Sequence, residues 1–195
     1  MKTIQKLGLP MPVIALAFLT LFSGMQCEKE FPPGTPKIEK LSTATQKGAN
    51  TFGCLVDGKA FTPKGTLGSD GLQVYYQYVD NAYPFNIGVT RKELNAPLRD
   101  MLIRSHYLEL QETTYQLGEM DTPGNIGSEY CIYNPNKDGF DDIYRTTSVV
   151  KGEITFTRFD VINQIASGTF WFDAVNKDGK VVQVREGRFD SHFVL

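Results

Sequence analysis

The chain has 195 residues, and its 20 Lys and Arg against 22 Asp and Glu give a net charge of −2. This mild acidity argues against nucleic-acid binding, which calls for a basic face, and it gives no electrostatic reason to bind an anionic membrane surface. Without residues 1–26, which carry two lysines and no acid, 169 residues remain at a net charge of −4, enough for one domain with a hydrophobic core.

Residues 1–26 have the three-part pattern of a secretory signal peptide. Lys2 and Lys6 precede an apolar run of about ten residues, whereas a membrane-spanning helix needs roughly 20. Cys27 follows where a bacterial lipoprotein is cleaved and lipidated. Gln26 departs from the small residue usual before that cysteine, so a plain secretory signal with an ordinary thiol is the alternative. We expect export and a lipid anchor on Cys27.

Residues 27–50 are predicted to form a flexible tether. Charged residues over 28–30 and prolines at 32, 33 and 36 break regular structure, and the polar stretch that follows has little to bury. We expect the protein to be an outer-membrane lipoprotein. Whether its domain faces the periplasm or the cell surface stays open.

From residue 51 to 195 the pattern predicts a single β domain. Asp57-Gly58 is a hairpin signal between two short apolar runs. Further strands are expected over 72–79, 85–90 and 130–133. Residues 101–110 fit a strand or a short helix, and the neighbouring strands favour a strand.

The alternation of apolar and polar residues is clearest in the last 50 residues. Residues 153–157 and 168–172 read as strands, and Asp178-Gly179 marks the next turn. In the last strand, the set of positions that face inward shifts by one residue past Gly187. This shift predicts a β-bulge at Glu186-Gly187. The fold class is therefore all-β, an antiparallel sandwich or barrel-like domain with hairpin connections and little helix apart from the signal segment.

Cys54 and Cys131 are an even pair in an exported protein, which favours a disulfide between them. Two buried, reduced thiols are the alternative.

Asn134, Asn136 and Asp138, followed by Gly139, have the oxygen spacing of a calcium loop. Arg145 stands where the bidentate Glu is expected, so a hairpin turn is favoured and calcium is the minor alternative. His106 and His192 are the only histidines, too few for a usual zinc site. Ser105 and His106 are adjacent in a strand and point to opposite faces, which argues against a catalytic pair.

Two parts of the chain resemble a group of uncharacterised Bacteroidetes cell-envelope lipoproteins. The first is TFGCLVDGKAFTP at 51–63; the second is GEITF at 152–156, SGTFWFDA at 167–174 and REGRFD at 185–190. The resemblance implies a lipid-anchored, mostly β domain of unknown function and supplies no catalytic residues.

Three carboxylates, Asp173, Glu186 and Asp190, could lie on adjacent terminal strands and supply the two acids of a glycoside hydrolase, but ordinary outward-facing charge is the favoured explanation. Tyrosines cluster around one strand at Tyr75, Tyr76, Tyr78 and Tyr83, and such side chains serve sugar or protein recognition or fill the edge of the core.

We therefore expect a non-enzymatic, lipid-anchored binding or interaction module of the cell envelope, with no cofactor and a glycan or an envelope protein as partner. A carbohydrate- or calcium-binding accessory domain is the alternative, and a secreted hydrolase is a distant third.

Overall fold

The computed structural model describes residues 40–65, 70–79, 81–133 and 140–195. This part of the chain is all-β and contains no helix. Within it, no helix is long and apolar enough to cross a membrane. The strands are β1 Thr51–Val56, β2 Lys59–Phe61, β3 Leu72–Tyr76, β4 Phe85–Arg91, β5 Leu98–His106, β6 Thr114–Gly118, β7 Asn125–Tyr133, β8 Phe140–Arg145, β9 Gly152–Asp160, β10 Ile165–Val175 and β11 Val181–His192.

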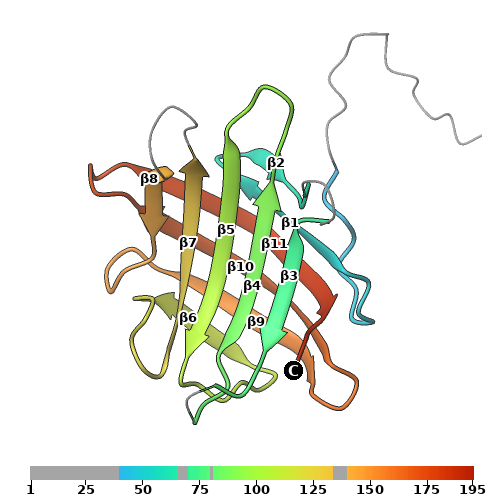
Figure 1. Cartoon of the computed structure of the whole chain (residues 1–195). Coiled ribbons are helices and arrows are strands. Elements are labelled where there is room, and N and C mark those ends of the chain that lie inside the picture. Colours follow the sequence, from blue (N-terminus) through green and yellow to red (C-terminus); the bar gives the residue numbers. More distant parts are fainter. Residues whose placement is uncertain (1–39, 66–69, 80, 134–139) are drawn as a thin grey trace, which may run out of the picture. The chain divides into compact units, whose positions relative to one another are not determined.

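Five strands close into a small barrel. The ring runs β10–β9–β6–β7–β8 and returns to β10, because β8 pairs with both β7 and β10. From β10 the sheet continues through β11, β1 and β2, and from β7 it continues through β5, β4 and β3. Figure 1 shows these two extensions as layers whose strands cross obliquely. The predicted all-β fold is confirmed, and sandwich and barrel are combined in it.

One strand pair departs from the predicted antiparallel pattern. β6 and β7 are parallel over two residue pairs, Leu117 with Ile126 and Gly118 with Gly127. The other named strand pairs of the described region are antiparallel.

The C-terminal end covers the outer edge of β3. The Tyr76 amide donates to the Val194 carbonyl at 2.9 Å, and the Val194 amide donates to the Val74 carbonyl at 3.0 Å. Covering an edge strand removes unpaired backbone groups that would otherwise pair with another chain. The two layers are therefore tied together at this edge.

Strict alternation places the core between the layers. In β10, Phe170, Phe172 and Ala174 are at most 3% exposed, whereas Trp171 on the opposite face is 40% exposed. Aromatic rings fill the centre, as where Phe85 meets Phe156 edge-to-face at 5.2 Å. The outer face of β10 is thus left free to carry polar chemistry.

Two turn predictions are confirmed. Asp57 and Gly58 have φ of 47° and 75°, the left-handed conformation that a tight hairpin turn demands. The bulge lies at Glu186, whose φ is 53°, since Phe170 pairs with Gly187 while Phe172 pairs with Val184. β11 therefore has one residue more than β10 at this point, and its inward parity shifts as predicted.

The predicted disulfide is not formed; both cysteines are free and buried. Cys131 pairs with Asp100 across β5 and β7 and so shares its face, and its thiol donates to Glu129 at 3.1 Å. Cys54 lies on the other face of this sheet, with its sulfur 4.0 Å from that of Met101. Because neighbouring strand residues point to opposite faces, the sheet itself separates the two thiols.

Candidate binding site beside Trp171

The outer face of β6, β9, β10 and β11 carries two rows of polar side chains that cross the strands. One row consists of Gln116, Glu153 and Trp171. The second row consists of Thr114, Thr155, Thr169 and Arg188. Antiparallel pairing places these residues directly opposite one another, so that each row presents neighbouring side chains to solvent.

A hollow of about 440 Å³ opens beside Trp171 on this face. Its lining residues are Ala44, Glu153, Thr155, Thr169, Phe170, Trp171, Glu186, Gly187 and Arg188. The bulge shapes this hollow, because it sets two residues of β11, Arg185 and Glu186, against the single Trp171 of β10.

Hydrogen bonds fix the orientation of Glu153. Gln116 Nε2 donates to Glu153 Oε1 at 2.8 Å, and Trp171 Nε1 donates to Glu153 Oε2 at 3.2 Å. Both donors are neutral, so the carboxylate keeps its charge and its remaining acceptor capacity for a ligand.

Arg185 holds the Trp171 ring in place. Its guanidinium carbon lies 5.5 Å from the ring centroid, within cation–π range. Nη1 donates to the carbonyls of Phe172 at 3.0 Å and Val184 at 2.8 Å, and Nη2 lies 2.6 Å from Asp173 Oδ1. The tryptophan is therefore a preorganised wall of the hollow.

Arg188 lines the hollow and brings a guanidinium group to it. Its Nε is buried and, among the described residues, has no hydrogen-bond partner. A buried donor without a partner costs free energy, so the Arg188 guanidinium is incompletely satisfied within the described part of the protein.

A segment from the predicted tether forms the far wall. This N-terminal strap, residues 44–50, is held against β11 by Asp190, which is 1% exposed. Five donors converge on the carboxylate: the hydroxyls of Thr45 and Ser167 and the amides of Lys47, Gly48 and Ala49. The folded unit therefore includes residues that we assigned to the tether.

Burial alone would raise the pKa of Asp190, but the hydrogen bonds from Thr45, Ser167, Lys47 and Gly48 outweigh it and hold this pKa well below its usual range. Asp190 is therefore an ionised structural anchor. It is shielded from solvent, because the strap covers it.

The three carboxylates of the hydrolase alternative have different surroundings. Asp190 anchors the strap, and Asp173 forms an ion pair with Arg185. Only Glu186 lines the hollow, where its carboxylate neighbour is Glu153.

The predicted tyrosines fall in different environments. Tyr76 is a core residue, 5% exposed, and stacks on Tyr83 at 5.1 Å. Tyr75 is half-buried. Tyr78 and Tyr83 are 60% and 43% exposed, with ring centroids 4.9 Å apart, so these two of the four tyrosines offer a surface to a partner.

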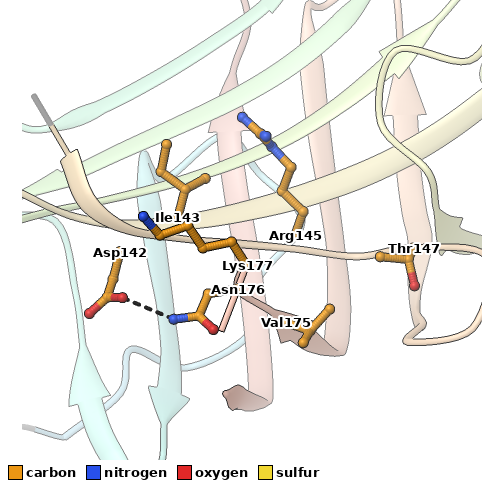
Figure 2. Close-up of a pocket in the computed structure, with 7 residues that line it drawn as sticks. All are labelled: Asp142, Ile143, Arg145, Thr147, Val175, Asn176 and Lys177. Atoms are coloured by element: carbon orange, nitrogen blue, oxygen red, sulfur yellow. Dashed lines mark hydrogen bonds between the residues drawn. The ribbon is translucent and has the colours of Figure 1, made fainter. Parts of the chain in front are cut away.

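A second hollow, of about 500 Å³, lies between β8 and the β10–β11 turn (Figure 2). The dashed line in Figure 2 marks the hydrogen bond that Asn176 Nδ2 donates to Asp142 Oδ1. Its length is 2.9 Å. Asn176 Oδ1 also accepts from the amides of Asp178 and Lys180, and Arg145 is paired with Glu129 at 2.6 Å. These polar groups serve the turn, which leaves this hollow fewer free groups than the one beside Trp171.

The remaining predicted sites are not assembled in the described region. The calcium candidates Asn134, Asn136 and Asp138, and also Cys27, lie outside the described residues. Within those residues, no group of three or more His, Cys, Asp or Glu is placed to hold a metal. Ser105 is 0% exposed and accepts a hydrogen bond from the Phe85 amide, while the adjacent His106 packs on Tyr107.

Residues 105–191 match the sequence family described as a domain of unknown function, DUF6252. The match includes β6 to β10 and most of β11, and with them the hollow beside Trp171 except Ala44. The C-terminal motifs behind the resemblance, over 152–190, lie inside the match, and TFGCLVDG lies outside it. No curated protein and no solved structure matches the chain.

Proposed function

We propose that this protein is a non-enzymatic carbohydrate-binding module of the bacterial cell envelope. One observation carries the proposal: the hollow beside Trp171 combines an exposed, fixed tryptophan with carboxylate, hydroxyl and guanidinium groups.

The chemistry of a sugar suits these groups. The apolar C–H face of a pyranose packs on an aromatic ring, while its hydroxyls both donate and accept hydrogen bonds. Glu153 and Glu186 supply acceptors, Arg188 supplies a donor, and Thr155 and Thr169 supply hydroxyls. Because Trp171 and Glu153 are already held in place, little conformational entropy is lost when a ligand binds.

The proposed location rests on the N-terminal sequence. An acid-free export segment precedes Cys27, and a lipid on Cys27 would hold the domain at a membrane. Mass spectrometry of the mature N-terminus from the native host tests this part. We expect a diacyl- or triacyl-modified Cys27 at the first position; a peptide that spans an intact Gln26–Cys27 bond contradicts the anchor.

The glycan part is tested by array binding followed by titration. Trp171 is the single tryptophan of the chain, so its fluorescence reports directly on the site. We expect at least one oligosaccharide from the array to change the emission of Trp171. In calorimetric titrations, which do not need the tryptophan signal, Trp171→Ala should weaken its binding by about 1–2 kcal/mol, roughly 5- to 30-fold, and Trp171→Phe by less.

Ile162→Ala is the matched control, because Ile162 is 93% exposed in the β9–β10 turn, away from the hollow. Its affinity should equal that of the wild type. An array without signal above background contradicts the proposal, as does a ligand that Trp171→Ala binds with unchanged affinity.

A further inference from the structure

A pocket of about 380 Å³ opens at the end of the fold where β1, β5, β7, β8 and β11 come together. Its volume lies near the lower end of small-molecule sites, which span about 300 to 1,000 Å³. We call it the end pocket. It shares no lining residue with the hollow beside Trp171.

The inner wall of the end pocket is apolar. Val56 and Val182 are 8% and 3% exposed, and Ile132 packs against the same core. Tyr130 and Tyr144 complete this wall, with ring centroids 6.2 Å apart. An apolar molecule in this pocket would exchange water for carbon contacts, which is the main driving force for binding at such sites.

The polar groups of the pocket are mainly hydrogen-bond donors. Burial raises the pKa of both Tyr130 and Tyr144, so both phenols stay protonated at neutral pH. The Arg99 guanidinium acts on the Tyr130 phenol, since it opposes the rise in pKa that burial causes, and its buried Nε has no hydrogen-bond partner among the described residues. Since the guanidinium is a donor only, the Tyr130 O–H remains free to donate.

The charges of the pocket favour an anion. Lys59 of β2 lines it, and its side-chain ammonium group has no ion pair or hydrogen bond within the described part of the chain. Arg99 forms an ion pair with Glu93 at 2.6 Å, and Glu93 is shared with the guanidinium group of Arg91. The one lining acid, Asp57, accepts a hydrogen bond from the Gln183 amide at 2.9 Å, which leaves its charge in place, but the two lining cations, Lys59 and Arg99, outnumber it.

We propose that the end pocket binds a small apolar carboxylic acid, with its hydrocarbon body against Val56, Ile132 and Val182 and its carboxylate toward Lys59, Arg99 and the Tyr130 hydroxyl. This site is independent of the proposed glycan site, so either proposal can fail alone.

Calorimetric titration of the full chain with octanoate and with 1-octanol at pH 8 tests this assignment. Octanoate should bind more tightly than the alcohol, because only octanoate carries the charge that Lys59 and Arg99 attract. Lys59→Gln should weaken octanoate about three- to fivefold and leave 1-octanol unchanged. Lys151→Gln, an exposed lysine outside the pocket, is the matched control and should behave as the wild type.

Ala96, a half-buried lining residue, gives a second test. Ala96→Trp should fill the pocket and abolish binding of both probes, while Ala96→Ser should bind as the wild type does. If Ala96→Trp fails to fold, the octanoate affinity of Lys59→Gln tests the assignment by itself. The assignment is overturned if octanoate does not bind the wild type, if it binds no better than 1-octanol, or if Lys59→Gln or a folded Ala96→Trp leaves its affinity unchanged.

Discussion

Asp190 shows how one residue joins distant parts of the chain. A buried carboxylate with five donors is well satisfied, whereas an amide in its place directs NH₂ hydrogens at groups that also donate. We expect Asp190→Asn to destabilise the fold by about 2–4 kcal/mol. Urea unfolding measures this. Asp173→Asn, which removes a partly exposed ion pair, is the control and should cost at most about 1 kcal/mol; equal losses in the two variants would contradict the role given to Asp190.

The same residue predicts a pH dependence of stability. The folded-state pKa of Asp190 lies below the value of about 3.9 for an unfolded aspartate. Its contribution is therefore complete above about pH 5 and is lost as the pH falls below 4 toward the folded-state pKa. Melting temperatures from pH 7 to pH 2.5 should fall more steeply for the wild type than for Asp190→Asn. Parallel curves would show that another group sets the acid sensitivity.

The C-terminal motifs make sense at the same scale. A Cβ on Gly168 would lie 2.1 Å from the Thr155 carbonyl oxygen, and one on Gly187 would lie 2.5 Å from the Phe170 ring. These glycines allow close strand packing, Phe189 fills the core, and Asp190 holds the strap. Most residues of these C-terminal motifs therefore have a structural role in packing. Trp171 is different, because its outward position follows from the alternation of β10, and that signal was present in the sequence.

At the level of elements, local chemistry determined which features were predictable. The Asp57-Gly58 turn and the bulge at Glu186 depend on neighbouring residues alone, and both were predicted. β6 and β8 were not predicted, because β6 is short and mostly polar and β8 follows a stretch rich in Asn and Asp. The strap was assigned to the tether because its partner, Asp190, is 141 residues from Ala49. Such distant pairing leaves no local pattern in the sequence.

The disulfide prediction failed for a related reason, since sequence does not show on which face of a sheet a cysteine lies. Iodoacetamide should leave Cys54 and Cys131 unlabelled in the native protein, because both are buried and burial raises the pKa of both thiols. After unfolding in urea without a reductant, both should become labelled. Mass spectrometry of the peptides decides: a bonded pair would stay unlabelled until a reductant is added.

At the scale of the whole molecule, the pairs of neighbouring strands in the barrel differ in how many residues they pair. β8 meets β10 through a single residue pair, Val175 with Arg145, and β6 meets β7 through two, whereas β10 pairs with β11 along almost its full eleven residues. Strand pairs that are short and have few hydrogen bonds have a lower free energy of local opening than long ones. The barrel should therefore open first at β6 and β8, while the layer that carries Trp171 stays closed.

Native-state hydrogen exchange measures this order. Amides of β6 and β8 should exchange faster than those of β9, β10 and β11, and added denaturant should accelerate the two groups differently. The β1–β2 hairpin is an internal control, since β2 is also a short strand but takes no part in closing the ring. Equal protection across the barrel would show that it opens as one cooperative unit. The expected result would mean that the site beside Trp171 stands on the most stable part of the fold, as a preorganised binding surface requires.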